Sequence, residues 1–449
     1  MKTMNQKHLL GLAVTIALAA PGMALAQTRS DREKALEARI AQLEKIVAEL
    51  AAQQQRSAPQ AGLAGQRVAE TPAARETPPA TQSGAVVPAT QPGTRFTYGG
   101  FIKFDAMVTD TSGGRIADGG AGRMFHLPAA IPVGGTGGDA YTDFGAQFSR
   151  VWLSADHLTE DGDKIKAHVE LDFYGGGSDK LGNEISTNTH GATLRHAYVS
   201  WNEWLAGQTW SNFMDAAAFP ESVDFAGVTD GLIFARQAQL RYTRGGWSFS
   251  LENPQTTVLS YRAGDGRYNS GDTLSPDVTA RWQTKGDWGH FSFATMLREY
   301  RVPADTARGL SVHASGKFNL GERDDIRYSL NAGRGIGRYL AFGTAPDVMT
   351  DALGNLKPLT GVGGYVSWRH AFNARWRGNL MYSAARFDND TDLTGFGITR
   401  DTQSVHANLI WSPLPKLDLG AEIGWGERTL ENGQSGDIKR VQTSVKYSF

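Results

Sequence analysis

The chain ends in the segment RVQTSVKYSF, residues 440–449, in which apolar and polar side chains alternate. Val441, Thr443, Val445, Tyr447 and Phe449 would share one face of an extended strand, and the residues between them would share the other. Such a strand, apolar on one side and charged or polar on the other, is typical of transmembrane β-barrels. The segment therefore predicts an all-β fold in which this strand lies in an outer membrane.

The same alternation recurs along the chain from residue 94. Residues 165–173 repeat it with Ile165, Val169 and Phe173 on one face and Lys166 and Glu170 on the other. Similar segments cover residues 291–297, 310–318, 326–330, 405–411 and 417–425. Short polar turns alternate with longer loops, which predicts about sixteen antiparallel strands, to within roughly two strands. An even count brings the last strand back against a first strand near residues 96–104.

A terminal aromatic residue after alternating apolar positions also resembles the signal that barrel-assembly machinery reads. We expect Val445, Tyr447 and Phe449 to form this signal. The rest of the chain contains no run of about 18 apolar residues, so no transmembrane helix is expected.

The composition excludes several classes of protein. The 449 residues carry 45 basic and 46 acidic side chains, whereas a nucleic-acid-binding protein usually has a basic surplus. The chain has no cysteine, which excludes disulfides, iron–sulfur clusters and thiolate zinc sites. The 10 histidines are scattered, and no hydrolase or phosphate-loop motif is present. We therefore expect no enzymatic activity, no metal and no cofactor.

The N-terminus predicts export. Lys2 and Lys7 precede an apolar run over residues 9–20, and Ala24 and Ala26 suit cleavage before Gln27. Residues 1–26 are therefore interpreted as a signal peptide.

Residues 27–56 have a helical period. Apolar residues at alternating spacings of four and three form a heptad seam, which predicts a short periplasmic coiled coil: Leu36, Ile40, Leu43, Val47 and Leu50. The general seam preference favours dimers, but Arg39 and Glu44 flank it in a pattern that specifies trimers, and we give this pattern more weight. The alternative is an amphipathic helix lying on its own protein. Residues 57–93 are rich in Pro, Ala, Gln and Thr and predict a disordered linker before a barrel over residues 94–449.

A barrel of this size leaves an aqueous channel, which a loop folded inward usually narrows. Residues 212–233 are the best candidate, because Phe213, Met214, Phe219 and Phe225 are too apolar for an idle surface loop. The alternative is a loop that packs on a neighbouring subunit.

Three motifs point to a family. YGGFIKFDA (98–106), AGQTWSNFMD (206–215) and FARQAQLRY (234–242) together resemble the DcaP-like trimeric porins of the outer membrane. The resemblance covers most of the mature chain. It implies sixteen strands per subunit, a homotrimer, and passive uptake of small anionic solutes, dicarboxylates among them.

Arginine suits the selection of carboxylates, because its planar fork pairs with them and stays charged. By strand face and position, we expect cationic side chains to line the narrowest zone: Arg150, Arg236, Arg241, Arg281 and Arg298, supported by Lys166. Asp215 and Glu221 would face them. Alternatively, lumen arginines and carboxylates only pair with one another. The faces of Arg195 and Arg236 are ambiguous, because each shares parity with apolar neighbours.

A second function remains open. The barrel, surrounded by outer-membrane lipid, could serve only as an anchor while the coiled coil acts as a periplasmic tether, with a possible contact to peptidoglycan.

Overall fold

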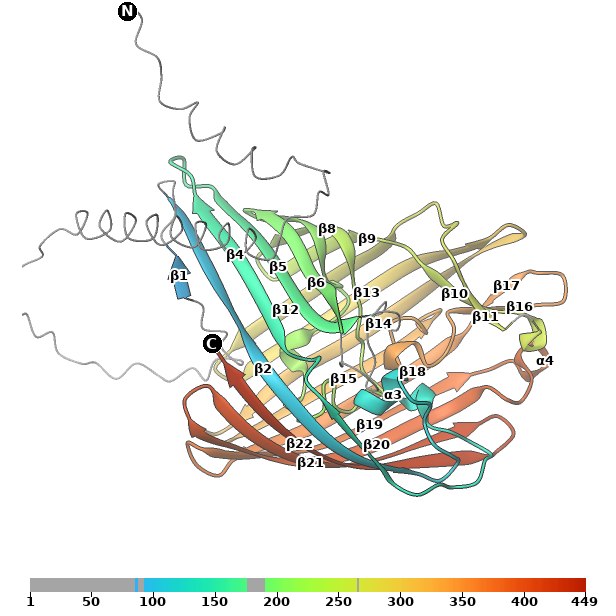
Figure 1. Cartoon of the computed structure of the whole chain (residues 1–449). Helices are drawn as coiled ribbons and strands as arrows, with labels where there is room; N and C mark the ends of the chain where they lie inside the picture. The colour runs from blue at the N-terminus through green and yellow to red at the C-terminus, as the bar shows by residue number, and fades with distance from the viewer. Residues whose placement is uncertain (1–84, 88–92, 176–189, 265) are drawn as a thin grey trace, which may run out of the picture. The chain divides into compact units, whose positions relative to one another are not determined.

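The computed structural model describes residues 85–87, 93–175, 190–264 and 266–449. The predicted signal peptide, the coiled coil with its seven trimerisation residues and almost all of the linker lie outside the described residues. The described residues from 93 onward form a barrel with its loops (Figure 1).

Sixteen antiparallel strands close into a barrel, as the alternation of the sequence predicts. The strands of the first half are β2 (Thr94–Thr111), β4 (Arg150–Leu158), β5 (Lys164–Gly175), β6 (Gly191–Trp201), β7 (Trp204–Trp210), β8 (Arg236–Arg244), β9 (Trp247–Glu252) and β12 (Asp277–Gly286). Those of the second half are β13 (Gly289–Val302), β14 (Asp305–Leu320), β15 (Asp324–Arg334), β18 (Thr360–Ala371), β19 (Trp376–Asp388), β20 (Thr399–Leu414), β21 (Leu417–Leu430) and β22 (Ser435–Ser448).

The last strand closes the barrel against the first. β22 pairs with β2 in a register that runs from Phe101 opposite Ser448 to Thr111 opposite Ile438, and the two strands lie side by side in Figure 1. Two short strands, β1 (Ala85–Val87) and β3 (Tyr141–Gly145), also pair with β2. The closure therefore confirms the predicted pairing, although β2 is longer than the expected first strand.

The two faces of the last strand differ as expected. Val441 is 53% exposed and Tyr447 is 50% exposed on the outward face, which meets lipid in a membrane. Arg440 and Gln442 are buried on the inward face, where Gln442 donates a hydrogen bond to Asp105 over 2.9 Å. The apolar residues of the alternating pattern therefore face lipid, and the polar residues face the lumen.

Connections differ between the two ends of the barrel. Strands are joined at one end, here called the turn end, by turns of two to five residues. Most connections at the opposite loop end are longer, and the predicted loops are found there. Both ends of the barrel sequence lie at the turn end, because β2 begins there and β22 ends there.

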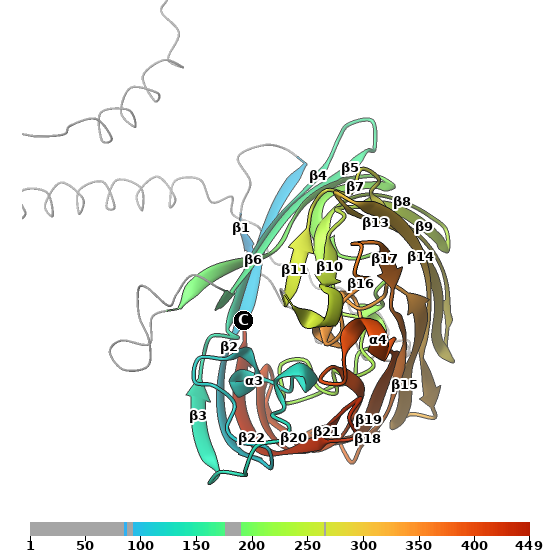
Figure 2. The same ribbon diagram turned by 90° about the vertical axis from the view of Figure 1, so that its right-hand side faces the viewer.

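The loop end also holds a small sheet that the sequence did not predict. Two loops contribute β10 (Thr256–Leu259), β11 (Arg267–Ser270), β16 (Val348–Thr350) and β17 (Leu356–Pro358), in which β10 and β16 run parallel. Val258, Val348 and Leu356 are buried against Tyr300 and Val302 of the barrel wall. These strands lie within the ring of barrel strands in Figure 2. Segments of three or four residues are too short for period two to reveal.

Helices are few and short in the described part. They are α3 (Ala121–Met124), α4 (Thr391–Thr394) and the single 3-10 turns η2 (Pro128–Ala130), η4 (Ala216–Ala218), η5 (Tyr261–Ala263) and η6 (Ala341–Gly343). No helix within the described residues combines the length and the apolar character needed to cross a membrane.

Candidate functional site

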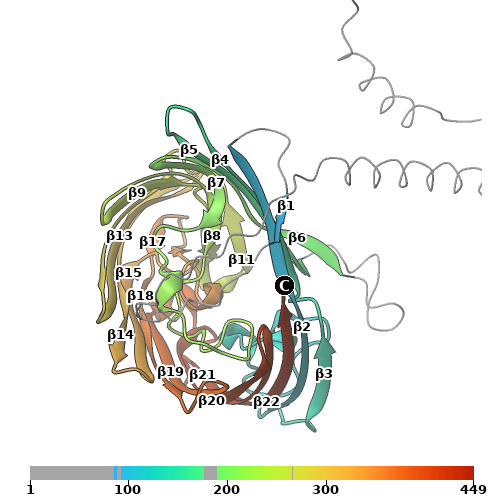
Figure 3. The same ribbon diagram turned by 90° about the vertical axis from the view of Figure 1, so that its left-hand side faces the viewer.

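The loop between β7 and β8, residues 211–235, folds into the barrel and is called the inner loop below; it lies inside the ring in Figure 3. One anchor near its start is Asp215, whose carboxylate accepts hydrogen bonds from Arg281 (3.1 Å), His290 (2.9 Å) and Ser315 (2.9 Å). Burial alone would raise the pKa of Asp215, but the hydrogen bond from His290 and the charge of Arg281 outweigh it and hold this pKa below its usual range. The carboxylate is therefore charged at neutral pH.

The middle of the inner loop is held by arginines of the next strands. Arg327 donates to the carbonyl oxygen of Phe219 over 2.5 Å. Arg369 and Arg377 donate to the carboxylate of Glu221 over 3.0 Å and 2.7 Å. Burial would raise the pKa of Glu221, but the charges of Arg377 and Arg369 dominate and lower it. Asp215 therefore faces Arg281, one of the predicted cationic residues, whereas Glu221 faces Arg369 and Arg377.

The later part of the inner loop is held as well. Glu422 accepts from Ser222 and from the backbone N–H of Val223, and Lys103 donates to the Val223 carbonyl oxygen over 3.0 Å. The loop thus lies along the lumen wall from β12 round to β2. Its contacts are made within its own barrel, so the inward position is confirmed.

The opposite wall carries a cluster of charges on β4, β5 and β6. Arg195 is 2% exposed and donates to Glu170 over 2.8 Å and to Asp172. Arg150 lies 3.4 Å from the same Glu170 carboxylate. A register shift in the pairing of β5 with β6 leaves Arg195 without a partner residue, and this bulge turns both Arg195 and His196 inward. The bulge explains why Arg195 faces the lumen, although simple alternation along the strand left its face ambiguous.

Two arginines of β8 have no carboxylate partner among the described residues. Arg236 lies with its guanidinium 4.9 Å from the centre of the Trp210 ring, and its buried Nη1 atom has no hydrogen-bond partner there. Arg241 donates to the side chain of Gln239 over 2.9 Å and to the Trp210 carbonyl oxygen over 2.5 Å. Their direct contacts are neutral acceptors or an aromatic face, and the carboxylates that act on them lie beyond salt-bridge distance: Glu252 for Arg241, and Asp172 and Glu170 for Arg236.

Each of the remaining predicted cations is paired with a carboxylate. Arg298 is 3% exposed and is bonded to Asp277 and Asp347, so it offers no free surface to a solute. Lys166 lies near the turn end and 3.7 Å from Asp156. Arg281 is at the inner loop but is paired with Asp215. The structure therefore brings Arg150, Lys166, Arg236 and Arg241 to one wall of the lumen, with Lys166 beside Asp156, and leaves Arg298 outside this group.

Residues that hold the inner loop were not predicted as a group. The sequence does indicate that Arg327 and Arg377 point into the lumen, since each is a charged residue on the polar face of an alternating strand. Their partners on the inner loop follow no local pattern, because they are separated by 108 and 156 positions in the sequence.

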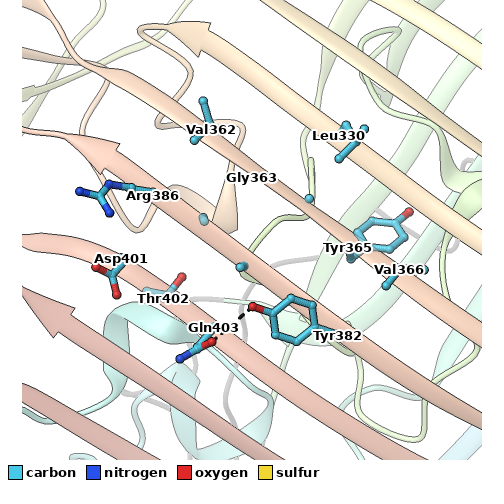
Figure 4. A pocket seen from close by; sticks show the side chains of 13 residues that line it. Leu330, Val362, Gly363, Tyr365, Val366, Tyr382, Arg386, Asp401, Thr402 and Gln403 are labelled. Atoms are coloured by element: carbon cyan, nitrogen blue, oxygen red, sulfur yellow. Dashed lines mark hydrogen bonds between the residues drawn. The ribbon is translucent and has the colours of Figure 1, made fainter.

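A groove of about 660 Å³ lies on the other side of the wall (Figure 4). It is bordered by side chains exposed on the outward face, Leu330, Val362, Val366 and Tyr382, and it is also lined by Arg386, Asp401 and Gln403. It therefore takes no part in a route through the barrel.

A family model for the DcaP outer membrane protein matches residues 23–449, which is nearly the whole chain. The chain belongs to the DcaP outer membrane protein family. Membership in this family and the closed barrel place the chain in the outer membrane as a porin-type channel protein.

Solved structures agree with this DcaP-family fold. The outer membrane channel DcaP of Acinetobacter baumannii is similar with a TM-score of 0.66 and 22% identity, over 80% of this chain and 99% of that chain. A loop-deletion mutant of OmpT from Vibrio cholerae is similar with a TM-score of 0.50 and 10% identity, over 80% of this chain and 100% of that chain. No curated protein matches the sequence. Within the described residues, no group of three or more His, Asp or Glu side chains is arranged to hold a metal ion.

Proposed function

We propose that this protein is a porin for the passive diffusion of small hydrophilic anions, dicarboxylates among them. The observation that carries the proposal is the pair Arg236 and Arg241, which have no carboxylate within 4.0 Å among the described residues. Asp215 and Glu221 of the inner loop do not offset them, because Arg281, Arg369 and Arg377 engage these two carboxylates. A solute anion would meet a net positive wall, and cationic rings favour anions in pores.

Reversing one of these charges tests the proposal. We expect Arg241→Glu to shift the reversal potential of the channel toward cation selectivity. A unit charge about 8 Å from a permeating ion changes its energy in water by about 0.5 kcal/mol, so a reversal changes it by about 1 kcal/mol, or roughly five-fold in relative permeability. The measurement is the zero-current potential across a planar bilayer with a salt gradient.

The matched control is Arg308→Glu, which makes the same charge change on a side chain that is 83% exposed on the outward face. An unchanged reversal potential in Arg241→Glu, with the control also unchanged, would contradict an anion-selective wall. Purified protein that gives no ion-permeable steps at all would favour the alternative, a membrane anchor acting through its coiled coil.

The proposal extends to assembly. In this homotrimeric arrangement residues 1–26 are cleaved and residues 27–56 form a periplasmic coiled coil that joins three copies of the chain. Because the barrel sequence begins and ends at the turn end, the turn end and Phe449 would then lie on the periplasmic side. The heptad seam and the flanking Arg39 and Glu44 support this arrangement. Contact with peptidoglycan would then involve the coiled coil.

Deleting Phe449 is expected to reduce the amount of membrane-inserted barrel strongly while leaving the conductance of each assembled channel unchanged. Phe449 pairs with Gly100 at the seam, with backbone hydrogen bonds of 3.1 Å and 3.4 Å, but has no part in the lumen wall. Heat-modifiable mobility of the outer-membrane fraction measures assembly, and Phe449→Tyr is the control that keeps a terminal aromatic ring. Equal amounts of inserted barrel with and without Phe449 would argue against an assembly signal in this residue.

A further inference from the structure

Four phenylalanine rings from three separate loops meet inside the barrel. Phe125 comes from the first loop (residues 112–140), Phe225 and Phe234 come from the inner loop, and Phe342 comes from the fold-back loop (residues 335–347). These four residues are called the aromatic quartet below. The three loops leave the barrel after β2, β7 and β15, so the quartet joins parts of the wall that do not neighbour one another.

The rings form a closed cycle of contacts. Ring centres are 5.3 Å apart for Phe125 and Phe342, and 4.4 Å apart for Phe342 and Phe234. They are 6.4 Å apart for Phe234 and Phe225, and 5.8 Å apart for Phe225 and Phe125. These separations are typical of favourable aromatic pairs. Phe125 is buried, whereas the other three rings keep part of their surface exposed.

The backbone at Phe342 has an uncommon conformation that sets the direction of its ring. Ala341 (φ 54°) and Phe342 (φ 53°) are both in the left-handed region, which residues other than glycine rarely adopt. Neighbouring loops hold this turn, since Ala341 donates to the Leu232 carbonyl oxygen over 3.0 Å and Arg267 donates to that of Gly343 over 2.7 Å. Strained residues of this kind persist only where the surroundings demand them, and they are frequent at functional sites.

The quartet also abuts the cationic wall. The guanidinium of Arg195 lies 5.7 Å from the Phe225 ring centre, and the Trp210 ring beneath Arg236 lies 4.9 Å from that of Phe234. The quartet and the arginines therefore bound the same region of the lumen, one with apolar rings and the other with charge.

We propose that the aromatic quartet sets the size limit of the channel, with Phe342 as the residue that decides it. This inference rests on the proposed porin function but concerns size rather than charge. The arginine wall selects for charge, and the rings exclude solutes that are too wide to pass beside them, because pore diameter and the groups lining the pore govern selectivity separately.

The test compares Phe342→Ala and Phe342→Trp with the unchanged protein, in liposomes that swell as neutral mono-, di- and trisaccharides enter. We expect Phe342→Ala to admit larger sugars and to raise single-channel conductance by roughly two-fold, and Phe342→Trp to lower both. The reversal potential should stay the same in both variants, because neither changes a charge. Phe342→Gly is a second variant that removes the ring and also suits the left-handed backbone, in case Phe342→Ala assembles poorly.

Phe396→Ala is the matched control, because this ring lies on another loop, is 61% exposed and stacks on no described aromatic residue. An unchanged sugar cut-off in the Ala, Gly and Trp variants of Phe342, all of them conducting, would overturn the size-limit proposal and leave the porin proposal intact. If the protein without substitutions neither conducts ions nor admits sugars, both the porin proposal and this inference are overturned.

Discussion

Replacing Arg298 with Ala is expected to destabilise the loop end of the barrel by about 3–5 kcal/mol, because buried Asp347 loses its ion-pair partner and buried Asp277 keeps only Arg338, 3.7 Å away. Arg298 donates to Asp277 over 3.1 Å and to Asp347 over 2.8 Å, and both aspartates are 0% exposed. It also donates to the carbonyl oxygens of Gly335 and Gln255. One side chain thus ties β12 and β13 to both loops that build the small sheet.

The midpoint of urea unfolding, followed by intrinsic fluorescence of the folded barrel, measures this effect. Arg308→Ala is the control, because Arg308 pairs with Glu299 over 3.6 Å while 83% of its side chain is exposed, and exposed pairs contribute little. Arg298→Lys should lie between the two, since it keeps the charge but loses the planar fork. A midpoint for Arg298→Ala equal to that of Arg308→Ala would mean that the two carboxylates do not depend on Arg298.

Replacing Asp215 with Ala is expected to release the start of the inner loop and to widen the channel. The change removes the acceptor shared by Arg281, His290 and Ser315, and breaking a buried charge pair of this kind costs about 3–5 kcal/mol. It also leaves the Arg281 charge uncompensated in the lumen. We therefore expect larger, noisier single-channel currents together with stronger anion selectivity in planar bilayers.

Asp156→Ala separates the two causes. Asp156 is also a lumen carboxylate, 3.7 Å from Lys166, but it does not touch the inner loop. It should change selectivity slightly and leave the current noise unchanged. Steady currents of normal size in Asp215→Ala would show that the other contacts of the inner loop, such as those of Glu221, hold it without this anchor.

Much of the fold could be predicted because its signals are local. Val441, Val445 and Tyr447 alternate with polar residues within one strand, and the same rule applied along the chain predicts the barrel and its approximate strand number. The inward loop could be predicted as well, since Phe213 and Met214 are too apolar for solvent and prove to be fully buried.

The sequence could not predict which lumen arginines have a carboxylate partner and which have none. Arg281 and Arg241 look alike in sequence, each a charge within a strand, yet only Arg281 has a carboxylate partner, and that partner lies 66 positions away. Arg195 faces the lumen because of a one-residue bulge, and a shift of one residue reverses the face of a side chain in a strand.

By itself, the sequence determined that this chain is a barrel with lipid on one side of each strand and a polar lumen on the other. Alternation is a property of neighbouring residues, so it survives without knowledge of the fold. Only the tertiary structure decided which arginines keep a free charge and which rings meet across the lumen. Both depend on loops such as the inner loop and the fold-back loop, which bring groups from distant strands within hydrogen-bond or ring-contact distance.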